Sequence, residues 1–300
     1  MNREQNKYVG WRFLYSPRWI GYYAMLVIFA VACVLLSDWQ FNRREEARAE
    51  IARIVNNYDA PAKNLSEVLR PGDSFDTDDM KWLPVTVTGE FVGEPLLARN
   101  RPGAGGSGSD VVRAFQATDG TVIFVDLGWV DYSLDGDTAA DFAALPTPPT
   151  GKTHDLTIRL RASEPQIKDR VSTTETVGTL NVSDMLEVAN RKGPAISEQQ
   201  LITAAYGMFI AAQPTVEHGA LPDKPALDEG PHLSYALQWI VFIAIAGSGV
   251  WYAARQEFKN FNRGSARVKQ MEEKAQAKQR AREAKRGKSD ADIEDELLDG

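Results

Sequence analysis

Two uncharged apolar stretches, one near each end, constrain this chain more than any other feature. Ile20 to Leu36 is seventeen residues without a charge, and Tyr235 to Ala254 is twenty. A helix of about 20 such residues crosses a hydrocarbon core of roughly 30 Å. Trp19 and Trp39 flank the first stretch, as aromatic residues do at membrane interfaces. The sequence therefore predicts two transmembrane helices.

The first stretch could instead be a cleaved signal sequence. A basic segment precedes it, and Ala30 to Cys33 is weakly similar to a lipoprotein cleavage site. The apolar run nevertheless continues three residues past Cys33, and no small-residue cleavage site follows it. We therefore interpret it as a retained membrane span.

The distribution of basic residues predicts the orientation of the two spans. Four Lys or Arg and one Glu precede the first span, and residues 255 to 288 hold twelve basic and four acidic residues. By the positive-inside rule both ends are cytoplasmic, and the protein is a multi-pass protein of the cell membrane. The predicted parts are a cytoplasmic N-terminus (1–19), a first span (20–39), an extracytoplasmic domain (40–230), a second span (234–254) and a charged cytoplasmic tail (255–300).

Charge and cysteine content exclude several classes of partner. Residues 40 to 230 carry 18 basic and 29 acidic side chains, and such a surface does not suit nucleic acid. The single cysteine, Cys33, lies inside the first span, so the exported domain has no disulfide. Without paired cysteines it also lacks the thiolate sites that copper carriers use.

Alternating apolar and polar residues predict a β domain between the spans. Asp119-Gly120 separates two strand candidates, which is the strongest hairpin signal in the chain. We expect a membrane protein with two terminal transmembrane helices around a mainly antiparallel β domain, a sandwich or barrel with a few helices. Its predicted parts are strands at 82–91, 96–100, 111–118, 121–130 and 154–162, a flexible loop at 102–109, and helices at 182–190 and 197–205. The first span is expected to continue as a helix to Asn56.

No enzyme motif is present, and His232 is the polar residue with the clearest functional signal. It is the only histidine next to a span, at the outer end of the second one, where an ionisable group is a functional candidate. If the two helices are neighbours, Gln40, Arg43 and Arg44 lie at the same level. One imidazole beside guanidinium groups suits an amphiphile with a metal centre and acidic side groups. The alternatives are that His232 only caps its helix and that the arginines only contact lipid headgroups.

Four local patches resemble the surfeit locus protein one family of cytochrome c oxidase assembly factors, in the form found in actinobacteria. The similarity spans residues 20 to 258, and its most specific part is the run that begins at His232. The patches are Trp39-Gln40-x-x-Arg43, Lys81-Trp82-Leu83-Pro84-Val85 with Gly89-Glu90-Phe91, Val125-Asp126-Leu127-Gly128-Trp129-Val130, and His232-Leu233-Ser234-Tyr235-Ala236-Leu237-Gln238-Trp239.

The chain also departs from the family pattern. The family has Asn-Arg where this chain has Asp126-Leu127, a Pro where it has Asp131, and Asn before the histidine where it has Gly230-Pro231. Roles of those polar neighbours cannot be transferred.

The resemblance implies a non-enzymatic factor that binds, delivers or stabilises haem a while the catalytic oxidase subunit matures. His232 would be the iron ligand, and Gln40, Arg43 and Arg44 would complete the site. The expected partners are cytochrome c oxidase subunits, alone or within a respiratory supercomplex, and membrane lipids. Two other hypotheses remain open at this point. One is a permanent accessory subunit of a respiratory oxidase or supercomplex, and the other is an unrelated two-span scaffold.

Overall fold

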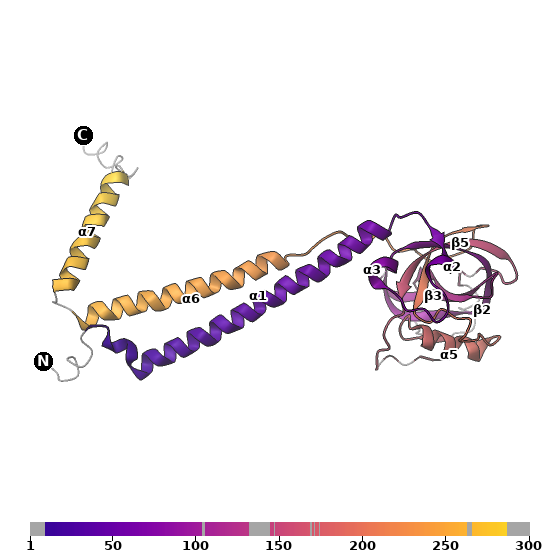
Figure 1. Ribbon diagram of the computed structural model, residues 1–300, viewed down its shortest axis with the longest axis horizontal. Helices are drawn as coiled ribbons and strands as arrows, with labels where there is room; N and C mark the ends of the chain where they lie inside the picture. Colours follow the sequence, from indigo (N-terminus) through magenta and orange to yellow (C-terminus); the bar gives the residue numbers. More distant parts are fainter. Residues whose placement is uncertain are drawn as a thin grey trace. The chain divides into compact units, whose positions relative to one another are not determined.

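A computed structural model of the protein describes residues 10–103, 106–131, 145–146, 148–168, 170, 172–173, 175–262 and 266–286. The chain divides into two compact units. One consists of the residues up to Arg44 together with those from Gly230 onward, and the other is Glu45–Glu229. Helices make up the first unit and a β-sheet dominates the second (Figure 1).

Two long helices form the centre of the first unit. They are α1 (Pro17–Asn57) and α6 (His232–Phe261), preceded by the short η2 (Arg12–Tyr15) and followed by α7 (Ala266–Arg286). The most apolar 18-residue segments of α1 and α6 are largely exposed, with only 11% and 6% of their residues buried. In α1, for example, Met25 and Ile28 are 69% and 70% exposed. Apolar side chains left uncovered by protein in a helix of this length are those of a membrane span, so both predicted spans are confirmed.

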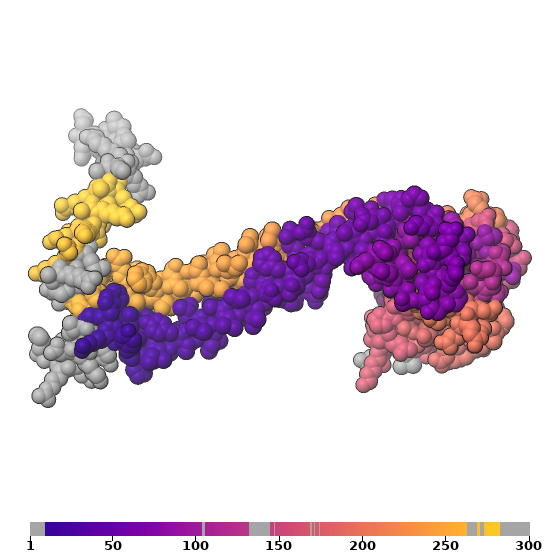
Figure 2. Space-filling model, in the orientation of Figure 1, coloured from indigo at the N-terminus to yellow at the C-terminus, as the bar shows by residue number. Residues whose placement is uncertain are grey.

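The two spans are joined by hydrogen bonds at both ends of their shared length. The Ser37 hydroxyl donates to the Ala236 carbonyl at 3.0 Å. Toward the chain termini, the Glu257 carboxylate accepts from Arg18 at 2.6 Å and from the Trp19 indole at 3.0 Å. The antiparallel helices therefore run side by side, as Figure 2 shows.

The second unit is a closed β structure. Strands β2 (Pro84–Gly103), β3 (Gly106–Ala117), β4 (Val122–Val130), β7 (Ala205–Gln213) and β5 (Thr153–Ala162) pair in that order, and β5 pairs with β2 again. Because these strand pairings close into a ring, the domain is a barrel, which is one of the two predicted forms. The pairing is mainly antiparallel, although β4 and β7 are parallel. The remaining elements are β1 (Lys63–Asn64), α2 (Leu65–Val68), α3 (Thr77–Met80), β6 (Thr176–Val177) and α5 (Val182–Lys192).

Both faces of β4 are buried, because the domain has two hydrophobic clusters. Ile123, Val125 and Leu127 point into the barrel, whereas Phe124 packs under α5 with Met185. The alternation breaks at Gly128, where φ is +103°.

Trp129 does not pack in the β core with Leu127. It is only half-buried and belongs to neither cluster, while the following Val130 packs against the barrel core. The change of face after Gly128 is the physical reason.

Two of the predicted local elements differ from the structure. The glycine-rich stretch 102–109 is largely paired strand, with Gly103 opposite Gly106 and Arg101 opposite Gly108. Gly103 and Gly108 lie under the Trp129 ring, where a Cβ atom would come within 2.3 and 2.5 Å of it. The second is the predicted helix at 197–205, which is a turn followed by the start of β7. The hairpin around Asp119-Gly120 and the helix at 182–190 are confirmed.

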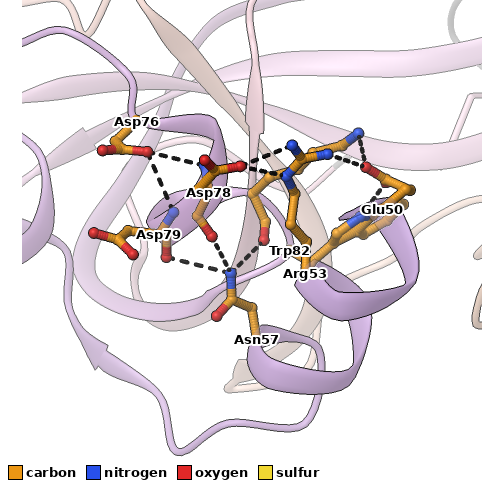
Figure 3. A network of polar contacts seen from close by, with 8 residues as sticks. Glu50, Arg53, Asn57, Asp76, Asp78, Asp79 and Trp82 are labelled. Atoms are coloured by element: carbon orange, nitrogen blue, oxygen red, sulfur yellow. Dashed lines mark hydrogen bonds and ion pairs between the residues drawn. The ribbon is translucent and has the colours of Figure 1, made fainter. Parts of the chain in front are cut away.

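The last turns of α1 belong to the β domain and are fixed to it by polar contacts (Figure 3). The Glu50 carboxylate accepts from the Lys81 ammonium and the Trp82 indole, both at 2.8 Å. The Arg53 guanidinium binds Asp78 at 2.7 Å. Asn57, the last residue of α1, donates to the Lys81 carbonyl at 2.9 Å. The helix ends there, close to the break predicted after Asn56.

Candidate functional site

His232 is the first residue of α6. Gly230, with a φ of +69°, and Pro231 turn the chain into the helix. Pro231 is the N-cap residue, and no side chain caps this end. The His232 ring therefore does not serve as a helix cap and is directed to another partner.

That partner is Gln40 of α1. The Nδ1 atom of His232 lies 2.9 Å from the Oε1 atom of Gln40, although 192 residues separate the two. An amide oxygen only accepts hydrogen bonds, so Nδ1 carries the proton in this contact, and in the neutral ring Nε2 then carries the lone pair. The ring is half-exposed, and Nε2 makes no hydrogen bond with any residue that the structure describes. An imidazole held by Nδ1 with a free Nε2 lone pair is the usual arrangement of a histidine metal ligand and the group that orients it.

The two arginines lie on α1 one turn beyond Gln40. Arg43 is exposed, and its guanidinium carbon lies 5.7 Å from the centre of the Trp39 ring. Arg44 is half-exposed. Positions three and four residues after Gln40 are its neighbours on a helix surface, so their backbone places them near the Gln40–His232 pair. No hydrogen bond between His232 and either arginine is found among the described residues.

The other two histidines sit in the β domain in different surroundings. His154 is 1% exposed, and its Nδ1 lies 3.0 Å from the Pro214 carbonyl oxygen. His218 is exposed and contacts the Gly219 carbonyl at 2.6 Å. Within the described ranges, no group of three or more His, Cys, Asp or Glu residues could hold a metal ion. His232 remains the histidine whose environment suits a ligand.

A second feature, a charged cavity beside the hydrophobic cluster under α5 and not inside the barrel, was not predicted from the sequence. It has a volume of about 450 Å³. Its charged and phenolic lining residues are Arg101, Asp110, Asp126, Arg161, Glu164, Tyr206 and Asp223. Burial raises the pKa of Asp126 to about 7 and that of Asp110 to about 6. Burial also raises the pKa of the Tyr206 phenol, which therefore stays protonated. Charged residues within the strands were the available signal, but they come from four separate strands.

The fold and the helix pair define a class of protein: a membrane protein with two terminal spans around a mainly antiparallel β-barrel domain. Within that class, residues 27–244 match the model of the SURF1 family, so the chain belongs to this family.

Curated relatives support the assignment. Uncharacterized SURF1-like proteins from Mycobacterium bovis and from two strains of Mycobacterium tuberculosis are each 29% identical to the chain over 258 residues, covering 85% of it and 90% of the relative. The SURF1 family is one of cytochrome c oxidase assembly factors.

Proposed function

We propose that this protein binds haem a through His232 and delivers or stabilises it while cytochrome c oxidase is assembled. The single observation that carries the proposal is the hydrogen bond from His232 Nδ1 to Gln40, which leaves Nε2 as an available ligand at a membrane-span terminus. Neutral imidazole nitrogen is a common axial ligand of haem iron. The proposed partners are oxidase subunits, and the proposed location of the site is the extracytoplasmic face of the cell membrane.

The residues around His232 fit the rest of such a ligand. Gln40 would fix the ring orientation and the tautomer, and Arg43 or Arg44 would pair with propionate groups, because a guanidinium binds a carboxylate through two parallel hydrogen bonds. Leu233 and Tyr235 on the first turn of α6 are 39% and 47% exposed, so apolar surface is available for a hydrocarbon tail. The haem itself would supply the iron centre that the oxidase requires. A single protein ligand in a half-exposed position favours transfer over permanent retention.

The absorption spectrum of protein purified in detergent from cells that make haem a tests the ligand. His232→Ala should lose the haem band while His218→Ala, the matched histidine control, keeps it. Gln40→Leu removes the partner of Nδ1 and should lower haem occupancy, whereas Gln40→Glu retains an acceptor and should preserve it. Circular dichroism of each variant checks that the β domain is folded. Wild-type haem content in His232→Ala would contradict the ligand assignment.

A deletion strain tests the role in the cell. Reduced-minus-oxidised spectra of its membranes should show a loss of haem a-containing oxidase, with b-type and c-type cytochromes near normal. An equal loss of all cytochromes would argue against a specific function in oxidase assembly. A permanent accessory subunit would instead co-purify one to one with the finished oxidase, which separates that alternative from an assembly factor.

A further inference from the structure

The cavity in the β domain contains a buried carboxylate without a cationic partner. Asp126 of β4 is 8% exposed and accepts one hydrogen bond, from the Gly128 amide to Oδ1 at 2.9 Å. No Lys, Arg or His of the described residues lies within ion-pair distance of it. An ionised carboxylate in such surroundings needs a proton or a cation from outside the protein.

The two arginines of the cavity are occupied elsewhere. Arg101 of β2 binds Asp110 of β3 at 3.1 Å and Glu164 at 2.9 Å. Arg161 of β5 lies over the Trp82 ring at 4.1 Å, with a guanidinium nitrogen 3.6 Å from the Met208 sulfur. Neither arginine therefore forms an ion pair with Asp126, although both charges lower its pKa from a greater distance.

Tyr206 provides an independent sign that the cavity is built for a ligand. The residue is 3% exposed, lines the cavity, and its hydroxyl forms no hydrogen bond with any residue in the described part of the chain. The hydroxyl lies close enough to Arg161, Asp126 and Glu164 for their charges to act on its pKa. Polar groups of buried residues are normally hydrogen-bonded, so this hydroxyl offers an unused polar position in the cavity that Asp126 also lines.

Charge and shape together select the ligand class. Four carboxylates and two guanidinium groups line the cavity, the fourth carboxylate being Asp223, so the lining is net negative when ionised. Apolar wall is supplied by Trp129, Leu180 and Leu221. The described carboxylates do not form a metal-binding group. A volume of about 450 Å³ lies in the range of small-molecule pockets.

We propose that this cavity binds a small aliphatic amine, with its ammonium group at Asp126 and the Tyr206 hydroxyl and its methylene chain against the apolar wall. An ammonium has three N–H donors, and the carboxylate and the phenol oxygen are acceptors that the protein itself leaves open. This site is separate from the His232 site and does not depend on the function proposed for it.

Amine binding should depend on pH because the site must ionise to attract a cation. The groups that act on Asp126 are Asp110 of β3, which raises its pKa, and Arg101 of β2 and Arg161 of β5, which lower it, together with the Gly128 amide. Tyr206 of β7 and Glu164 complete the surroundings. Affinity should therefore increase as pH rises through the pKa of Asp126, and binding at a lower pH should release a proton.

Isothermal titration calorimetry of the full-length protein in detergent with 1,4-diaminobutane tests the proposal. We expect saturable binding of one amine, at least tenfold weaker in Asp126→Asn and several-fold weaker in Tyr206→Phe. Glu217→Gln, an exposed carboxylate outside the cavity, is the charge-matched control and should bind as wild type does. Repeating the titration in buffers of different ionisation enthalpy measures the released proton.

Three further probes make the result decisive. 1,4-Butanediol lacks the charge and tetramethylammonium lacks N–H donors, so each should bind at least tenfold more weakly than the diamine. Calcium should not displace the amine. Binding of the diol equal to that of the diamine, displacement by calcium, or unchanged affinity in both cavity variants would overturn the proposal. If Asp126→Asn does not fold, Tyr206→Phe carries the test by itself.

Discussion

The Asp126→Asn substitution should make the stability of the β domain less dependent on pH. The amide oxygen of asparagine can still accept the Gly128 hydrogen bond, so the change removes the ionisable group and keeps the local geometry. The pKa of this carboxyl is raised from 3.8 to about 7, mainly by burial and then by the neighbouring Asp110 charge. Folding is therefore linked to uptake of a proton over this range.

The sign and size of the effect follow from that linkage. Below pH 3.8 the carboxyl is protonated in both states and has no effect on stability. As pH rises toward 7, the unfolded chain releases the proton while the folded protein keeps it, so the free energy of unfolding falls. One pKa unit corresponds to about 1.4 kcal/mol. Between mildly acidic and neutral pH, the wild type should lose about 2–3 kcal/mol that the variant keeps.

Guanidinium chloride unfolding of both proteins in detergent, followed by the β-sheet circular-dichroism signal at several pH values, measures the difference. The stability of Asp126→Asn relative to the wild type should rise steadily with pH. Glu217→Gln removes an exposed carboxylate and should track the wild type. Parallel curves for wild type and Asp126→Asn across the whole range would refute the reasoning, because a solvated Asp126 would titrate alike in both states.

Two further predictions address the barrel and the topology. Trp129→Ala should cost about 2–3 kcal/mol, less than the ~3–5 kcal/mol of a fully buried tryptophan, because the ring is half-buried; a larger loss in the same unfolding assay would mean that the ring contributes to the core after all. Protease added to the outer face of intact spheroplasts should digest the domain between residues 40 and 230 and spare a tag on Gly300. Loss of the tag would show that the predicted orientation of the second span is wrong.

The spans and the hairpin could be predicted because their signals are local. An uncharged run of seventeen residues is long enough to predict a membrane span without reference to the rest of the chain. In the same way, Asp119-Gly120 between two alternating segments predicts a hairpin. The sequence also placed Gln40 at the level of His232 on the condition that the two spans are neighbours, because both positions lie at the outer ends of their spans. The sequence could not show which ring nitrogen of His232 contacts Gln40. Only the structure shows that Nδ1 makes this contact and that Nε2 is left without a hydrogen bond among the described residues.

The glycine-rich stretch and the charged cavity could not be predicted because their causes are distant in the chain. Glycines at 103 and 108 usually indicate a flexible loop, but here they make room for the ring of Trp129, which arrives from β4. Asp126 and Tyr206 are eighty residues apart, and only the parallel pairing of β4 with β7 brings their strands together. Most carboxylates of so acidic a domain are expected to be solvated, and the burial of Asp126 depends on neighbouring strands that are distant in the sequence.

Closure of the strand ring restricts how a partner protein can dock on this domain. An open sheet edge accepts an extra strand through its backbone, a mode known as β-augmentation. Here β2 and β5 pair with each other, and Leu201 and Ala220 bridge to β4 beside its short contact with β7. Little backbone of the ring is therefore left for such an addition in the described part of the domain. A partner protein has to recognise side chains and connecting segments instead. Substitutions of exposed side chains should therefore map such a contact better than proline substitutions within the strands.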